Sequence, residues 1–395
     1  MSMNLLPSDL EEEILCRVPF RCLAKFRSVC KHWNSMILDE RLILKNLSRT
    51  RMSYSGEHEF IITHNACLSS SVSIKEQQNV VDSPPSLVTK NLSLKRVRPA
   101  RRVKVYKIVQ CDGLLLCVMD NQLLVRNPLL KETSWVKCGS DFHAYDDAYS
   151  LGYLSPCDYR ILRFRCASNS RNRPPRVEVC QLASKTWKVI DYPISTFDWV
   201  LKIPLSILSL RGTPYWIGLR EEEDHTTTAF VQSFDFAKER FQPIDQLPFR
   251  YEELNPIAME IFKGDRLSVL EQCHKTRKIC IWVKHWLLPS WSRLMVVAIP
   301  HFPLLHPPSS RVSTDFFLDK NGRLVVICVE FNVQYIYNIY RVMGENNDEW
   351  QVFETDNAAE NSIYCSCSFV PSLVRLPGFL KQDTSRIRWK KSRFN

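Results

Sequence analysis

The sequence is poor in glycine, with 10 glycines against 22 prolines in 395 residues. Nucleotide folds that cradle phosphate use glycine-rich loops, so this scarcity argues against them. Apolar runs that could cross a bilayer are also missing: the longest, GLLLCVMDNQLLV, is short and is interrupted by Asp120 and Asn121. The first residues do not form the basic and apolar stretches of a signal peptide. We therefore expect a soluble protein of the cytoplasm, the nucleus or both.

The 15 cysteines do not form a recognisable framework of disulfides or metal ligands. Their number is odd, no CxxC pair occurs, and several lie inside apolar runs such as LLLCVM and VVICVEF, which favours reduced, buried thiols. One cluster has the residue types of a metal site but fits no common zinc spacing: Cys273, His274, Cys280 and His285. We expect no metal and no cofactor.

Motifs of catalysis are missing as well. The sequence contains no GxSxG, no P-loop and no HExxH, and no segment has the eight closely spaced ligands of a RING domain. A hydrolytic propeller enzyme would need acids or histidines converging on a central pocket, and the sequence does not show them. The acidic run REEEDH, residues 220–225, favours a solvated loop over a grip on a basic substrate. We predict no catalytic residues and no enzyme.

The formal net charge of +11 is concentrated in two stretches. Eight Lys or Arg and no acid lie between Lys90 and Lys107, and residues 381–395 carry six basic residues and one acid. These stretches lie in an expected linker and tail rather than on one face with interleaved aromatics, which favours solvated charge over a nucleic-acid site.

The N-terminal segment LPSDLEEEILCRVP predicts a helix. Ser8 and Glu11 have the spacing of a capping box, and Leu10, Ile14 and Val18 recur on one face. Pro19 ends the pattern. Two short helices are expected to follow, in CLAKFRSVC and from about Lys31. A bundle of three short helices buries too little core to be stable alone, which implies a partner surface.

The segment LPSDLEEEILCRVPFRCLAKFRSVCKHWNSMI resembles an F-box, the motif by which substrate receptors dock on the Skp-type adaptor of a Skp–cullin–F-box ubiquitin ligase. The resemblance spans Leu6 to about Leu47. It implies that the following residues lie in or next to the adaptor contact: Leu6, Pro7, Ile14, Leu15, Leu23, Val29, Cys30 and Trp33. Two positions depart from the family pattern: Cys22 stands where a serine cap is usual, and Asn46 where a histidine is common. Cys30 and His32 have no second ligand pair nearby, so we assign this stretch to docking rather than to a metal.

The rest of the chain predicts short strands without a long amphipathic helix. An aromatic residue recurs after a turn at spacings of 50 to 59 residues: Trp135, Trp187, Phe241, Trp291 and Trp350. Upstream of each lies a strand start, marked by Gly113, Asp158, Gly212, Gly264 and Gly322. A strand-rich repeat near fifty residues is typical of propeller blades, of which five are detectable. A pair of packed β-sheets is the alternative.

Segments such as CDGLLLC, VRNPLLKETSW, VEVCQLASKTWKVI and SFDFAKERFQPIDQLP occur in the order seen in the F-box-associated interaction domain of plant F-box proteins, which this part of the chain resembles. The predicted organisation is an F-box over residues 1–48, a partly irregular basic connector over 49–102, an all-β, propeller-like domain over 103–375 and a basic tail over 376–395.

The resemblance implies a non-catalytic receptor that docks on a Skp-type adaptor, and through it on cullin and RING subunits, and captures a protein target with the β-domain. The target and its binding residues do not transfer within the family. Trp216, Trp282 and Trp286 are candidate anchors, although propeller tryptophans more often lie in the core. The alternative is a ligase-independent module that binds protein or nucleic acid through the basic linker and tail.

Overall fold

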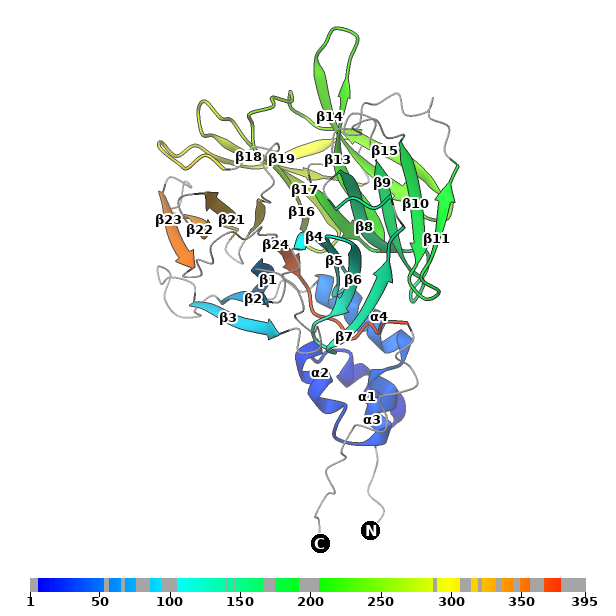
Figure 1. Cartoon of the computed structure of the whole chain (residues 1–395). Helices are drawn as coiled ribbons and strands as arrows, with labels where there is room; N and C mark the ends of the chain where they lie inside the picture. The colour runs from blue at the N-terminus through cyan, green and yellow to red at the C-terminus, as the bar shows by residue number, and fades with distance from the viewer. Residues whose placement is uncertain are drawn as a thin grey trace, which may run out of the picture.

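The structure is a computed structural model of the whole chain. It describes residues 6–52, 57–64, 68–75, 86–93, 105–139, 141–144, 146–165, 175–191, 206–286, 290–305, 314–318, 322–331, 335–343, 349–355 and 366–377. Four helices come first and are followed by an all-β domain (Figure 1). No described helix has the length and apolar character needed to span a membrane.

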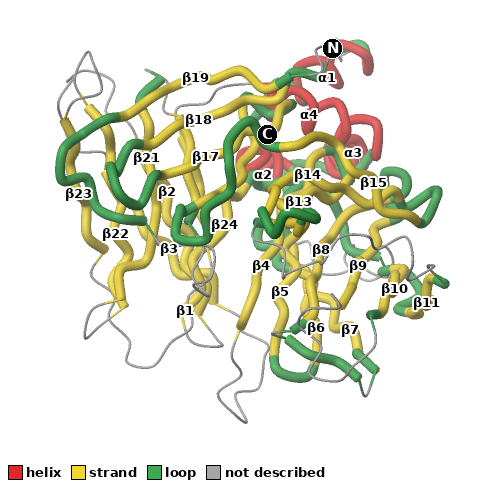
Figure 2. The backbone as a smooth tube through the Cα atoms, turned by 90° about the horizontal axis from the view of Figure 1, so that it is seen from above, coloured by secondary structure: helices red, strands yellow, loops and turns green. Residues whose placement is uncertain are grey.

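The helices are α1 (Ser8–Leu15), α2 (Phe20–Phe26), α3 (Lys31–Ile37) and α4 (Glu40–Met52). The expectation of three helices ending near residue 48 is therefore wrong by one helix. The helices gather on one side of the strands (Figure 2).

The predicted capping box is also wrong. Pro7 is the N-cap of α1, with φ −53° and ψ 140°, and its carbonyl accepts hydrogen bonds from the backbone of Leu10 and Glu11. Ser8 lies inside the first turn, one position too far along the chain to cap it. The Glu11 carboxylate instead lies 2.7 Å from His32 Nε2 on α3, so it joins two helices.

In the part of the chain that the structure describes, the β-domain forms six four-stranded antiparallel sheets, each of which is one blade. Their inner strands contact one another in a closed ring (Figure 1). This arrangement confirms the propeller and excludes the sandwich. The first sheet consists of β4 (Val105–Cys111), β5 (Leu114–Met119), β6 (Gln122–Asn127) and β7 (Glu132–Lys137). The second consists of β8 (Asp147–Tyr153), β9 (Tyr159–Arg165), β10 (Arg176–Gln181) and β11 (Thr186–Ile190). The third consists of β12 (Ile207–Leu210), β13 (Thr213–Glu221), β14 (Thr227–Asp235) and β15 (Arg240–Gln246).

The fourth sheet consists of β16 (Ile257–Phe262), β17 (Arg266–Gln272), β18 (Ile279–Lys284) and β19 (Trp291–Val297). The fifth consists of β20 (Asp315–Leu318), β21 (Leu324–Phe331), β22 (Tyr335–Met343) and β23 (Glu349–Thr355). The sixth sheet has the order β24 (Ser366–Phe369), β1 (Glu57–His64), β2 (Leu68–Lys75) and β3 (Ser86–Ser93). The prediction of a partly irregular connector over 49–102 is therefore wrong in part, because this range contains the three strands β1, β2 and β3, which complete the sixth blade. Because β24 and β1 come from opposite ends of the domain, their pairing closes the ring.

The repeated aromatic residues occupy one position in the fold. Each lies on the outermost strand of its sheet: Trp135 on β7, Trp187 on β11, Phe241 on β15, Trp291 on β19 and Trp350 on β23. The sixth outermost strand, β3, has the sequence SLVTKNLS and carries no aromatic residue. The aromatic repeat could therefore reveal only five of the six sheets.

Glycine is used where an inner strand turns into the next strand. Asp112 and Gly113 join β4 to β5 with φ of 49° and 78°, the two positive values that a type I′ hairpin requires. A Cβ on Gly113 would lie 2.7 Å from the backbone nitrogen of Ser372. The glycine thus allows the segment after β24 to pass directly over this turn.

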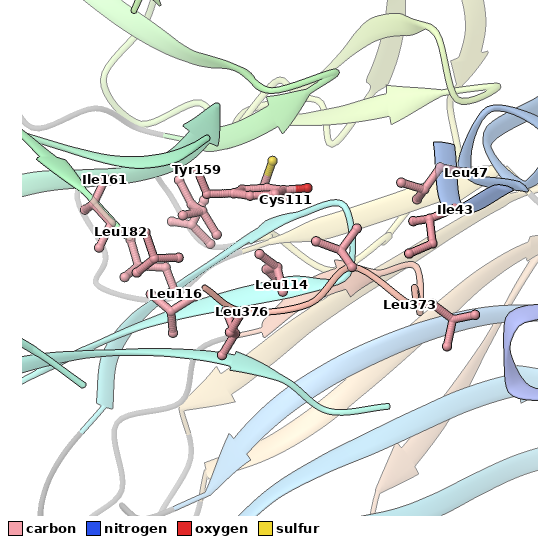
Figure 3. Close-up of a cluster of buried hydrophobic side chains, with 14 of the residues drawn as sticks. Ile43, Leu47, Cys111, Leu114, Leu116, Tyr159, Ile161, Leu182, Leu373 and Leu376 are labelled. Carbon is pink, nitrogen blue, oxygen red and sulfur yellow. The ribbon is translucent and has the colours of Figure 1, made fainter. Parts of the chain in front are cut away.

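The helices and the propeller share one hydrophobic core. Ile43 and Leu47 of α4 belong to the same buried cluster as Leu114 and Leu116 of β5 and Leu373, which follows β24 (Figure 3). The F-box is therefore packed onto the first blade rather than attached by a free linker.

Polar contacts fasten the segment after β24 to the same blade. Asn127 Nδ2 donates to the carbonyls of Ser372 (3.0 Å) and Val374 (2.7 Å). The Glu132 carboxylate accepts from Arg375 Nε and from the backbone of Leu376. Leu376 is fully buried, so the structure places it in the propeller and not in the predicted tail.

Candidate functional site

The helical unit exposes large apolar side chains on its surface. Leu10 and Ile14 lie four residues apart, and therefore on one face of α1, and Val29 precedes α3. Ile14 is 53% exposed and Val29 54%. We call Leu6, Leu10, Ile14 and Val29 the exposed apolar set of the helices. Because α1 and α3 lie at the end of the helical unit away from the sheets (Figure 1), the helices of this set are open to a partner.

The predicted adaptor residues separate into three groups in the structure. Leu6, Pro7, Ile14 and Val29 are exposed, and Cys30 and Trp33 are partly buried. Leu15 and Leu23 are fully buried in the shared core, where they hold the helices together rather than face outwards. Leu10 was missing from the predicted contact residues although its spacing from Ile14 places it on the same face.

Cys30 has a structural role at the start of α3. It is the N-cap of that helix, and its sulfur accepts a hydrogen bond from the backbone of Trp33 at 3.4 Å. The Trp33 ring packs on Phe26, with ring centres 5.6 Å apart. No group of three or more potential metal ligands occurs among the described residues. The geometry thus gives Cys30 a helix-capping role.

Charged contacts fix α1 against α4 behind the exposed apolar set. The Glu13 carboxylate lies 2.8 Å from both Lys45 Nζ and Arg49 Nη2. The hydrogen bonds from Arg49 and Lys45 lower the pKa of Glu13 to about 2. Asn46 Nδ2 donates at 2.9 Å to the carbonyls of Cys16 and Val18, just past the end of α1. The orientation of α1 is therefore set before any partner binds.

The metal candidates of the fourth sheet are used in local hydrogen bonds. His274 contacts the Asn255 side chain through Nδ1 at 2.8 Å, and His285 Nε2 contacts Ser292 Oγ at 2.6 Å. Hydrogen bonds from Thr276 lower the pKa of Cys273, whereas burial raises that of Cys280.

One acid pair does converge at the centre of the ring, which the sequence did not indicate. Glu260 on β16 is hydrogen-bonded to Asp315 on β20, and Ser368 Oγ on β24 lies 3.0 Å from Glu260 Oε2. Burial, and then the charge of Asp315, raises the pKa of Glu260 well above its ordinary value. Both side chains are more than nine-tenths buried, so this pair joins three inner strands and offers little surface to a substrate.

The remaining candidates lie in different parts of the chain. The acidic run lies at the tip of the β13–β14 hairpin, which projects from the edge opposite the helices (Figure 1), and its acids bond locally, for example Glu222 to Arg220 at 3.0 Å. Trp216 is fully buried, Trp282 is half-buried and Trp286 is 45% exposed. The basic tail, and most of the basic stretch before β4, lie outside the described residues.

Comparisons with known proteins agree with this architecture. The F-box domain profile matches residues 3–45, and the profile of the F-box associated beta propeller domain matches residues 59–376. The solved structure of Hadza microbial sialidase Hz136 aligns with 71% of this chain and 63% of its own, at 9% identity and a TM-score of 0.39, which is too low to inform fold or function.

Relatives from Arabidopsis thaliana extend over nearly the whole chain. The chain is 37% identical to "Putative F-box protein At3g16590", over 94% of this chain and 98% of that protein. It is 32% identical to F-box/WD-40 repeat-containing protein 1, over 97% of this chain and 90% of that protein. The chain belongs to the family of plant F-box proteins that carry an F-box associated β-propeller domain.

Proposed function

We propose that this protein is the substrate-recognition subunit of a Skp–cullin–F-box ubiquitin ligase. The exposed apolar set of the helices docks on a Skp-type adaptor, which links the chain to cullin and RING subunits. The propeller captures a protein target in the cytoplasm or nucleus. The chain contributes proximity rather than catalytic groups, because it raises the effective concentration of the target near the ubiquitin-carrying enzyme.

The observation that carries this proposal is the exposure of Leu10, Ile14 and Val29 on helices whose backs are firmly held. Exposed apolar side chains that share one ordered face indicate a protein interface, and Leu10 and Ile14 share one face of α1. The shared core between α4 and the first blade supports the second half of the proposal. A rigid joint holds the target at a fixed distance from the adaptor.

The test is co-purification of the full chain with a plant Skp-type adaptor, comparing the wild type with Ile14→Asp. An unpaired carboxylate in an apolar interface is strongly unfavourable, so we expect adaptor binding to fall by about tenfold or more. The matched control is Val189→Asp on β11, since Val189 is 54% exposed and far along the chain from the helices.

Val189→Asp is expected to bind the adaptor as the wild type does. Equal adaptor binding by Ile14→Asp and the wild type would refute the docking surface, and no binding by the folded wild type would refute the ligase role. Thermal unfolding of each variant checks that the fold is intact.

A further inference from the structure

The fourth sheet holds an exposed tryptophan in a fixed position. Trp286, which follows β18, donates a hydrogen bond from Nε1 to the backbone carbonyl of Asp265 at 2.9 Å. Its ring lies 6.0 Å from the ring of Tyr215 on β13, tilted by 50°. The side chain thus has a partner on one side and a hydrogen bond at its polar end, yet 45% of it is exposed. A large apolar side chain that is fixed in place yet exposed is a candidate contact for a partner.

Cations lie in the two turns next to this ring pair: Arg211 precedes β13, and Lys263 and Arg266 flank Asp265, whose carbonyl accepts the Trp286 hydrogen bond. Lys263 Nζ and Arg266 Cζ lie 5.3 and 5.4 Å from the centre of the Phe262 ring. Arg211 is close enough to lower the pKa of Tyr215, although burial raises that pKa by more. We call the following residues the Trp286 patch: Arg211, Tyr215, Lys263, Asp265, Arg266 and Trp286. Its three cations outnumber its one acid, Asp265, which already pairs with Arg266 at 3.3 Å.

The patch lies far from the adaptor surface. It belongs mainly to sheet β16–β19, which lies across the ring from sheet β4–β7, the blade packed on the helices (Figure 1). A molecule bound there leaves the exposed apolar set of the helices free. The geometry therefore allows both surfaces to be occupied at once.

We infer that the Trp286 patch is the site where the propeller grips its target, and that it takes an acidic protein segment carrying an apolar side chain. This inference rests on the proposed function, in which the propeller captures the target. Tryptophan, tyrosine and arginine are the residues that most often dominate the energy of protein interfaces. The excess of cations complements carboxylates, and the open part of the indole accepts an apolar side chain.

A single-stranded nucleic acid fits these observations less well. Such ligands need successive aromatic faces on which bases stack, along a stripe of cations. The Trp286 ring is paired with Tyr215, and the Phe262 ring already lies beside Lys263 and Arg266. Three cations confined to the turns beside one indole suit a short carboxylate-bearing segment better than a long phosphate backbone.

The test measures binding of labelled peptides of equal length to the full chain by fluorescence anisotropy. Each peptide has one central leucine, flanked by glutamates, by lysines or by serines, and oligodeoxythymidine is the fourth probe. We expect the glutamate peptide to bind about tenfold tighter than the serine peptide, and Trp286→Ala to remove that advantage. Leu254→Ala is the matched control, because Leu254 is an apolar side chain, 58% exposed, outside the patch.

The double variant Lys263→Glu/Arg266→Glu keeps the tryptophan and is expected to prefer the lysine peptide, so the inference can be tested even if Trp286→Ala misfolds. Equal binding of all peptides, no binding at millimolar concentration, or unchanged binding by Trp286→Ala would overturn it. Tightest binding of the oligonucleotide would replace it with a nucleic-acid site. Peptide binding needs no adaptor. A negative peptide result would therefore refute the Trp286 patch alone, and a negative Ile14→Asp result would refute the adaptor surface alone.

Discussion

At the scale of single residues, Asn46 is one of the two positions that depart from the family pattern, and the structure shows which contacts its side chain makes. Its amide reaches two carbonyls beyond the end of α1, where a helix leaves backbone acceptors without partners. Asn46 itself is buried. One side chain on α4 therefore closes the turn between α1 and α2.

Replacing Asn46 by leucine keeps the number of side-chain heavy atoms and removes both hydrogen bonds. We expect Asn46→Leu to lower the free energy of unfolding by about 1–3 kcal/mol, because buried carbonyls lose their partners. Urea unfolding of the full chain measures the change. The control is Ser48→Ala on the same helix, since the Ser48 hydroxyl makes an exposed bond to the Lys45 carbonyl and its loss should be nearly neutral. Equal unfolding of Asn46→Leu and the wild type would contradict the assigned role.

At the scale of elements, the contact between α1 and α4 depends on pH through Glu13. The folded-state pKa of about 2 lies below the ordinary value of 4.5, so the ionised carboxylate stabilises the contact. This stabilisation is present above about pH 4.5 and is lost as the pH falls toward 2. The side chain is partly exposed, so the effect is small and screened by salt.

We expect Glu13→Gln to be less stable than the wild type at pH 7 and to approach the wild type at pH 3. Denaturant unfolding at the two pH values measures the gap, which is the difference in the free energy of unfolding between the variant and the wild type. Glu253→Gln, at an exposed position between β15 and β16, serves as the control and should show little gap at either pH. A gap that is as wide at pH 3 as at pH 7 would show that Glu13 does not act through its charge.

Sequence patterns predicted most elements and failed at identifiable places. The F-box helices, the strand-rich repeats and the hairpin glycines were predictable because helical spacing, strand alternation and positive φ leave local signals. The blade containing β1, β2 and β3 was not, because β3 carries no aromatic residue and its inner strand, β24, is supplied from far along the chain. Trp286 could not be told from core tryptophans such as Trp216, because exposure beyond the end of a strand depends on tertiary packing.

At the scale of the whole molecule, the F-box and the propeller share one buried core, so we expect them to unfold as one unit. Leu373 is fully buried in the cluster that also contains Ile43 and Leu47 of α4. A defect at this position should therefore be felt in both parts. Domains joined by a flexible linker would respond separately.

We expect Leu373→Ala to destabilise the protein by about 2–5 kcal/mol and to accelerate amide hydrogen exchange in α4 and β5 together. The matched control is Leu305→Ala, a buried leucine in the cluster between the fourth and fifth blades. It should be similarly destabilising while leaving exchange in α4 closer to that of the wild type. Faster exchange in β5 with unchanged exchange in α4 would contradict the single unit.

The pairing of β1 with β24 also decides when this protein can fold on the ribosome. Ile61 is made early, but its partner Cys367 emerges only after the other five blades. At about 5–20 residues per second, the edge of β1 stays unpaired for tens of seconds during translation, and unpaired edges favour aggregation. The helices emerge first, yet the core beneath them lacks Leu373 until synthesis has passed that residue. A chain that stops early therefore lacks a finished core beneath the F-box as well as a finished propeller.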